Sequence, residues 1–212
     1  MNYQELSIKN LKEINKEFCE KVYKKYKYDC VIFVAKGAFL IGKSFSEFAD
    51  VPLLEIYATR KGGKLKKILS PVLKILPEKL KSYLRKKEMK STVHSKDPNR
   101  EINFNSDIWK RYKKCKKILI VDDSIDTGYS ALLAKNAVAN YFRKSEVKVA
   151  VINLFDKAKE VYEPDFHLYD NTMIKGPWSN DSKENKRFLK EYYEWKEHHL
   201  WNIQWNKYIQ LI

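Results

Sequence analysis

Carboxylates, hydroxyls and one glycine are concentrated near the middle of this 212-residue sequence, in the stretch ILIVDDSIDTGYS at residues 118–130. The aliphatic residues 118–121 predict a strand that is buried on both faces. Asp122 and Asp123 follow this strand, and their acceptor-only carboxylates suit the hydroxyl groups of a vicinal diol. Residues 127–130 then place a glycine and hydroxyls where a helix is expected to begin, so free backbone N–H groups there can bind a phosphate.

A phosphate site beside a diol site describes the recognition of a ribose 5-phosphate. Asp126 lies between the two and could take a proton from the group that attacks the sugar, which makes it the candidate catalytic residue. The residues expected to contact the 5-phosphate are Asp126, Thr127, Gly128, Tyr129 and Ser130.

These thirteen residues resemble the phosphoribosyl pyrophosphate (PRPP) binding signature of the type I phosphoribosyltransferases. The resemblance implies that Asp122 and Asp123 hold the ribose hydroxyls and that residues 127–130 wrap the 5-phosphate. An aspartate at position 126 is similar to the branch that acts on 6-oxopurines, where it is thought to act at N7 of the base. Mg²⁺ is the implied cofactor; it would be held mainly by PRPP, with Asp122 and Asp123 as candidate contacts.

A second strand–turn–helix pattern lies upstream, where the apolar run at residues 29–35 is followed at once by Lys36 and Gly37. Repetition of this pattern predicts a parallel α/β sheet whose ligand lies at the carboxyl edge. The sequence VAKGAF resembles the pyrophosphate-binding turn of the hypoxanthine-guanine branch. Arg60, after a predicted strand at residues 51–59, is a further pyrophosphate candidate, although a solvated arginine at a strand end is an equal alternative.

The base-binding residues come from two weaker matches. Lys157 corresponds to the family lysine that contacts O6 of a 6-oxopurine. The sequence NTMIKGPWSND at residues 171–181 is similar to the TWIxxPW loop of bacterial xanthine-guanine phosphoribosyltransferases. Where that loop stacks a tryptophan on the purine, this chain has Met173, which is apolar and polarisable but gives a weaker platform. Ile174 is expected to offer backbone groups to the base edge.

The length favours one domain over residues 1–212, with a mostly parallel central sheet flanked by helices. Residues 1–26 have the apolar spacing of an amphipathic helix. Within the domain we expect a lid or helical insertion at residues 61–117, a base-binding hood at 156–181 and an aromatic C-terminal helical tail at 182–212.

The composition limits which partners and which cellular location are expected for the protein. The formal net charge of +15 could attract nucleic acid, but dispersed lysines are typical of a solvated surface and a basic field also suits PRPP, so nucleic-acid binding is not expected. Three cysteines without C-x-x-C spacing indicate neither a disulfide framework nor a zinc site. The sequence shows no signal peptide or membrane span, so a cytoplasmic protein is expected. Family precedent implies a homodimer or homotetramer.

The expected function is transfer of the phosphoribosyl group from PRPP to a nitrogenous base, with a 6-oxopurine as the favoured acceptor and pyrophosphate as the product. Two alternatives stay open. One is a PRPP-binding regulator that does not catalyse and that could contact nucleic acid. The other is a response-regulator receiver, because KKILIVDDS resembles its first strand and Asp170 its phospho-acceptor. The sequence after Asp170, however, has no apolar strand to complete a receiver.

Overall fold

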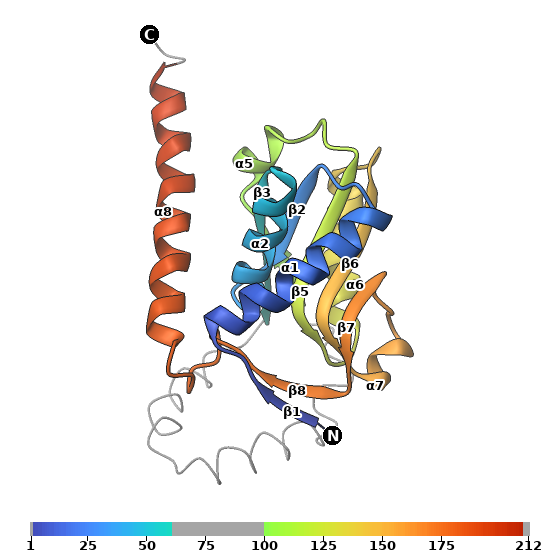
Figure 1. Ribbon diagram of the computed structural model, residues 1–212. Helices are drawn as coiled ribbons and strands as arrows, with labels where there is room; N and C mark the ends of the chain where they lie inside the picture. The colour runs from blue at the N-terminus through green and yellow to red at the C-terminus, as the bar shows by residue number, and fades with distance from the viewer. Residues whose placement is uncertain (1, 61–99, 210–212) are drawn as a thin grey trace.

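The aliphatic runs of the sequence form a central six-stranded sheet (Figure 1). The computed structural model describes residues 2–60 and 100–209. Along the sheet the strand order is β4-β3-β2-β5-β6-β7. The strands span Cys30–Val34 (β2), Leu53–Arg60 (β3), Arg100–Asn103 (β4), Lys117–Ile125 (β5), Glu146–Leu154 (β6) and Phe166–Asp170 (β7).

All neighbouring strands in this sheet are parallel except β4, which pairs antiparallel with β3. The register of the two central strands sets Val31 beside Leu119 and Phe33 beside Val121. Because parallel strands end at the same edge, the residues that follow β2 and β5 are brought together. The expected α/β fold with a mostly parallel sheet is therefore confirmed.

Side chains alternate between the two faces of the sheet. Phe33 and Val121 belong to a core beneath the helices α1 (Ile8–Lys25), α2 (Phe39–Ala49) and α8 (Asn185–Ile209), whereas Ile32 and Ile120 belong to a core on the opposite face. The second core contains side chains from α6 (Tyr129–Tyr141) and from the short helices α5 (Ser106–Lys110) and α7 (Asp156–Lys159). Helices thus cover both faces, as the continuous apolar strands require.

The first residues differ from the predicted helix at 1–26. Asn2–Glu5 forms a strand, β1, which pairs in parallel with β8 (Thr172–Lys175) in a separate two-stranded sheet (Figure 1). The helix α1 begins only at Ile8, after Ser7 caps it by accepting a hydrogen bond from the Asn10 N–H at 3.1 Å. The strand could not be seen in local sequence because its partner lies near the other end of the chain.

The predicted insertion at residues 61–117 is described only in part, because residues 61–99 lie outside the described residues. Its last part contains β4 and α5, where Trp109 is buried and stacks on Phe104 with ring centroids 3.9 Å apart. Its role as a lid stays a prediction. Within the described ranges, no helix is long and apolar enough to cross a membrane.

The receiver alternative is wrong. In a receiver β5 would be the first strand, but here β2 and β3 precede it in the chain and pair on one side of it, while Asp170 ends the edge strand β7. The three cysteines are free thiols, as expected.

Gly42 lets α2 lie close to the sheet, and this contact can be tested. A Cβ atom at Gly42 would lie 2.8 Å from Phe33 Cβ and 3.1 Å from Leu53 Cδ1. Alanine is favoured over glycine in a helix by about 1 kcal/mol, but overpacking a core costs about 1–3 kcal/mol. We expect Gly42→Ala to lower the free energy of unfolding in urea by about 1–2 kcal/mol.

Lys43→Ala is the matched control, because Lys43 is the next residue on α2 and its side chain is 39% exposed. This variant should change the unfolding free energy by less than about 0.5 kcal/mol. An unchanged or increased stability of Gly42→Ala would contradict the close helix–sheet contact.

Candidate active site

Two adjacent carboxylates lie near the carboxyl end of the central strand β5. The strand continues two residues past them to Ile125, which is 3% exposed, so pairing with β6 extends beyond the acidic pair. Asp122 is 8% exposed, and its Oδ1 accepts a hydrogen bond from the Asp123 N–H at 2.9 Å. The pair is therefore fixed by the sheet and not by a loop.

Burial changes the acidity of both groups. Loss of water raises the pKa of Asp122 well above its usual value, and the neighbouring charge of Asp123 adds to this rise. Burial also raises the pKa of Asp123. A ligand that presents hydroxyl protons or a cation to these oxygens would stabilise their charged forms.

The loop after β5 has the backbone geometry of an anion site. Gly128 has a φ of 81°, a left-handed conformation that glycine adopts readily, and α6 begins at Tyr129. The first hydrogen bond of the helix runs from the Leu132 N–H to the Gly128 carbonyl at 2.9 Å. The N–H groups of residues 129–131 therefore have no carbonyl partner within the helix and are available to a phosphate.

Asp126 is exposed at the start of this loop, and its Oδ1 accepts a hydrogen bond from Ser124 Oγ at 2.8 Å. Gly128 itself is packed against the segment around α7. A Cβ atom there would lie 2.8 Å from the Ala158 carbonyl oxygen and 2.9 Å from the Tyr162 nitrogen. This contact brings α7, which carries the exposed Lys157, directly beside the phosphate-binding loop.

The Lys36-Gly37 turn reaches the acidic pair. The Ala35–Lys36 peptide bond is cis, and a Cβ atom at Gly37 would lie 2.7 Å from Asp123 Oδ1. Any other residue at position 37 would therefore collide with the carboxylate. Arg60 ends β3, and its side chain lies outside the part of the structure that is described.

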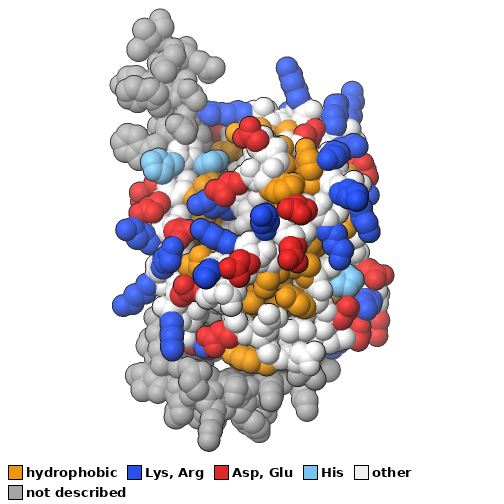
Figure 2. Space-filling view, viewed as in Figure 1, with side chains coloured by type: hydrophobic (Ala, Val, Ile, Leu, Met, Phe, Trp, Pro, Cys, Tyr) orange, Lys and Arg blue, Asp and Glu red, His pale blue; other side chains and the backbone are white. Residues whose placement is uncertain are grey.

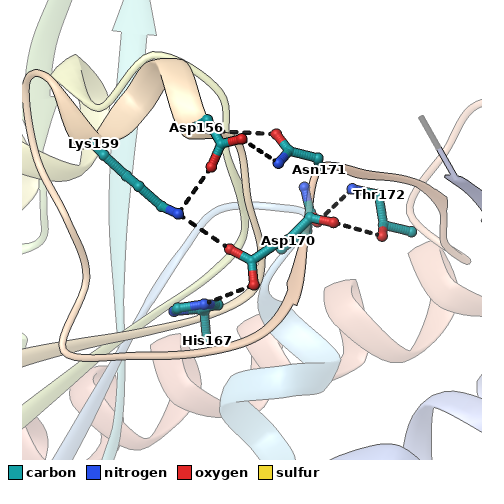
Figure 3. Close-up of polar contacts among 7 residues, drawn as sticks. Asp156, Lys159, His167, Asp170, Asn171 and Thr172 are labelled. Atoms are coloured by element: carbon teal, nitrogen blue, oxygen red, sulfur yellow. Dashed lines mark hydrogen bonds and ion pairs between the residues drawn. The ribbon is translucent and has the colours of Figure 1, made fainter.

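A polar network holds α7 to the corner between β7 and β8 (Figure 3). Lys159 Nζ lies 2.9 Å from Asp156 Oδ1 and 3.4 Å from Asp170 Oδ1. Asn171, whose φ is 49°, accepts a hydrogen bond from the Asp156 N–H at 3.0 Å. Lys159 lowers the pKa of Asp156, so this carboxylate stays charged in the network. The corner that leads into β8 is thus fixed relative to α7.

The strand β8 carries the two remaining base-binding candidates. Met173 lies beside Tyr3 of β1 in the strand register, and Tyr3 is 57% exposed. The Lys175 carbonyl accepts a hydrogen bond from the Leu6 N–H at 2.9 Å. Because alternate residues turn their backbone groups to opposite edges of a strand, those of Ile174 face away from β1. The backbone groups of Ile174 are therefore not used in the pairing with β1.

Apart from Arg60, the predicted residues thus lie in two places. The turn at residues 36–37, the acidic pair and the loop at 126–130 meet at the carboxyl ends of β2 and β5, and Lys157 lies beside that loop on α7. Met173 and Ile174 lie on the separate two-stranded sheet. The sequence did not indicate Tyr193 of α8, whose hydroxyl oxygen lies 2.7 Å from Lys36 Nζ.

The site combines an acidic pair on a central strand, a helix N-terminus with free N–H groups and a lysine-glycine turn, which is the arrangement expected of an enzyme that handles a phosphorylated ribose. The match to a family model makes the assignment specific. Residues 3–185 match the phosphoribosyl transferase domain, and the chain therefore belongs to the phosphoribosyltransferase family and is a PRPP-dependent enzyme.

Solved structures share the fold at low sequence identity. A purine phosphoribosyltransferase from Pyrococcus horikoshii Ot3 is 17% identical with a TM-score of 0.55, covering 85% of this chain and 96% of its own. The Helicobacter pylori xanthine-guanine-hypoxanthine phosphoribosyltransferase is 16% identical with a TM-score of 0.57, covering 88% and 98%. A Neisseria gonorrhoeae protein with bound ppGpp is 16% identical with a TM-score of 0.55, covering 90% and 97%. No curated protein matches the sequence.

The raised pKa of Asp122 predicts how stability depends on pH. The folded state binds a proton at higher pH than the unfolded state, whose value is about 3.9, so stability falls as the pH rises from there through the folded pKa. Asp122→Asn removes this penalty. We expect it to raise the free energy of unfolding by about 1–3 kcal/mol at pH 7, with a gain that shrinks as the pH approaches 4.

Urea unfolding at several pH values measures the difference in unfolding free energy between Asp122→Asn and the wild type. Asp156→Asn serves as a control of opposite sign, because the pKa of Asp156 is lowered and its charge favours the folded state above the unfolded pKa. If Asp122→Asn were less stable than the wild type at pH 7, the desolvation of this carboxylate would not be the dominant effect.

Proposed function

We propose that this phosphoribosyltransferase transfers the 5-phosphoribosyl group of PRPP to a 6-oxopurine and releases pyrophosphate. The observation that carries the proposal is the close approach of Gly37 to the Asp123 carboxylate. A Cβ atom at position 37 would lie only 2.7 Å from Asp123 Oδ1. This approach brings a lysine turn to one side of the acidic pair, while the loop at residues 126–130 follows on the other. PRPP has the matching order of groups: pyrophosphate, ribose diol and 5-phosphate.

In the proposed reaction, a ring nitrogen of the base attacks C1 of the ribose. A C1–N bond forms, the bond from C1 to the pyrophosphate oxygen breaks, and its electron pair leaves with pyrophosphate. Asp122 and Asp123 accept hydrogen bonds from the ribose hydroxyls, and the free N–H groups at the start of α6 hold the 5-phosphate. Lys36 contacts the pyrophosphate. Binding energy from both phosphate groups then positions the anomeric carbon.

Asp126 is the proposed acceptor of the proton that the attacking base must lose. Its carboxylate is exposed at the start of the phosphate-binding loop and is held by Ser124. A carboxylate in this position can take a proton from a ring nitrogen or stabilise the positive charge that develops there.

A 6-oxopurine acceptor is supported by the groups around the hood. Lys157 can donate to a carbonyl oxygen, the backbone of Ile174 faces away from β1, and Met173 supplies an apolar surface beside the aromatic ring of Tyr3. The Helicobacter pylori protein of the same fold acts, by its name, on xanthine, guanine and hypoxanthine. The hood at residues 156–181 would therefore determine the specificity for the acceptor base.

Type I phosphoribosyltransferases generally use Mg²⁺ together with PRPP. Among the described residues no three metal-ligating side chains converge, so a site built by the protein alone is not present in that part of the chain. Asp122 and Asp123 fit a shared site, because hard carboxylate oxygens at a buried position would gain from a divalent cation. When bound, the ion would neutralise charge on the pyrophosphate oxygens.

A PRPP-binding regulator is the second candidate. The bound ppGpp of the Neisseria gonorrhoeae protein favours it, because that protein has the same fold and holds a nucleotide. A regulator that contacts nucleic acid has less support, because Lys and Arg side chains alternate with acidic ones over the face that Figure 2 shows. The cytoplasmic location, the homo-oligomer and the lid remain predictions.

Pyrophosphate release from Mg-PRPP tests the proposal, with hypoxanthine, guanine, xanthine, adenine, orotate and uracil each added separately and a control without base. We expect release with at least one 6-oxopurine and none without base. Release only with adenine or a pyrimidine would refute the oxopurine assignment. Binding of PRPP by calorimetry without release from any base would favour the regulator.

Asp126→Asn tests the catalytic role. We expect turnover to fall by about 10²- to 10⁴-fold, while the Kd for Mg-PRPP changes by less than about threefold, because the amide keeps the size of the side chain. Steady-state kinetics and calorimetry measure the two effects separately. Asp107→Asn, an exposed carboxylate on α5, is the control and should leave both values unchanged. Wild-type turnover in Asp126→Asn would remove the assigned role.

A further inference from the structure

The C-terminal helix α8 reaches the lysine turn of the candidate active site. Lys36 Nζ donates a hydrogen bond to the hydroxyl oxygen of Tyr193 at 2.7 Å. The same ammonium lies 5.0 Å from the ring centroid of Tyr193 and 5.7 Å from that of Tyr192. The helix starts at Asn185, the last residue of the segment that matches the family domain. The side chain that holds Lys36 is thus supplied by a helix that lies almost entirely beyond the matched segment and packs in the same core.

Aromatic packing fixes α8 over the two elements that flank the turn. Phe188 and Tyr192 are each 1% exposed. Phe39, at the start of α2, packs its ring against Phe188, Tyr192 and Trp195 at centroid distances of 6.3, 5.4 and 5.5 Å. Phe33, on β2, lies 5.1 Å from Trp195. The helix is therefore bound to the residues on both sides of Lys36.

A buried carboxylate on β3 sets the rotation of the helix. Glu55, whose side chain is 12% exposed, accepts hydrogen bonds from the hydroxyls of Tyr57 and Tyr192, and Lys196 Nζ lies 3.3 Å from its Oε2. Burial and the bond to Glu55 raise the pKa of Tyr192, so its hydroxyl stays a donor. Successive helix residues point about 100° apart. With Tyr192 held by Glu55, Tyr193 is directed to the neighbouring side of α8, where Lys36 lies.

We propose that Tyr193 is a positioning residue for the pyrophosphate group: its hydroxyl and ring hold the Lys36 ammonium where the pyrophosphate of PRPP binds. The inference rests on the proposed role of Lys36. An ammonium has three N–H donors, and Tyr193 accepts one of them, so two remain for phosphate oxygens. A free lysine side chain must lose its rotamer freedom when a ligand binds, whereas the contact with Tyr193 restricts it beforehand.

Tyr193→Phe removes the hydroxyl and keeps the ring. Loss of one hydrogen bond to a charged group should raise the Kd for Mg-pyrophosphate, measured by calorimetry, by about 3- to 10-fold. The KM for PRPP should rise by a similar factor, while kcat and the KM for the base stay within about twofold, because the contact is made equally in the ground and transition states. A role in folding alone would lower the active fraction and leave Kd and KM unchanged.

A double-mutant cycle with Lys36→Met shows whether the effect passes through Lys36. Lys36→Met should weaken pyrophosphate binding, and adding Tyr193→Phe to it should have no further effect. Tyr23→Phe is the matched control, because Tyr23 also has a lysine over its ring but belongs to α1. Lys27 Nζ lies 4.0 Å from the centroid of the Tyr23 ring. This control should leave pyrophosphate binding unchanged.

The outcomes separate the two proposals. If Lys36→Met weakens binding but Tyr193→Phe does not, the role of Tyr193 is wrong and that of Lys36 stands. An equal effect of Tyr193→Phe with and without Lys36 would also overturn the inference, as would tighter binding, which would mean that Tyr193 withholds Lys36 from the ligand. If Lys36→Met binds pyrophosphate as the wild type does, the proposed role of Lys36 fails and the inference fails with it. Calorimetry with pyrophosphate needs no acceptor base, so a wrong base assignment does not affect this test.

Discussion

The position of the buried Asp122 and the partly buried Asp123 on the central strand is the constraint on which the arrangement of the site depends. Carboxylates removed from water are unfavourable unless a cation or hydrogen-bond donors approach them. The parallel sheet keeps the pair in place, because β5 continues to Ile125 and pairs with β6 both before Asp123, at Asp122, and after it, at Ser124 and Ile125. The absence of a side chain at Gly37 lets the turn after β2 approach the Asp123 carboxylate, where a Cβ atom would lie only 2.7 Å from Oδ1. The protein thus holds two poorly solvated carboxyl groups at the place where the proposed function puts the ribose.

The elements around this pair offer positive charge to a ligand in two different ways. Backbone groups at the start of α6 offer positive partial charge without a charged side chain, whereas the lysine turn offers a full charge that must be held in position. The hood is attached through α7 and the network of Asp156, Lys159 and Asp170, and the Asn171 N–H joins it to the central sheet by donating to the Leu154 carbonyl at 2.9 Å.

The sequence predicted those parts of the fold and site that depend on local patterns. The strands at 29–35 and 118–121 were recognised because they are continuous apolar runs, and residues 36–37 and 126–130 because they follow strand ends. It could not show that residues 2–5 form a strand, since that strand exists only through pairing with Thr172–Lys175. The sequence also did not indicate Tyr193, because the partner of this side chain, Lys36, lies 157 residues away in the chain. A tyrosine in an aromatic helix has no local feature that distinguishes it from a packing residue.

The fold alone does not determine the base. The similar structures are 16–17% identical to this chain, so they establish the architecture and leave the identity of individual contacts open. In the proposed function, the acidic pair and the loop at residues 126–130 bind the phosphoribosyl part of the substrate, which is the same whatever the acceptor. Specificity must therefore come from residues that the central sheet does not fix, namely those of α7 and of the small sheet formed by β1 and β8. Met173 and Tyr3 lie side by side there, joined from opposite ends of the chain, so the surface offered to a base depends on both strands. A comparison at position 173 alone would leave out Tyr3, the exposed aromatic residue that the neighbouring strand places beside it.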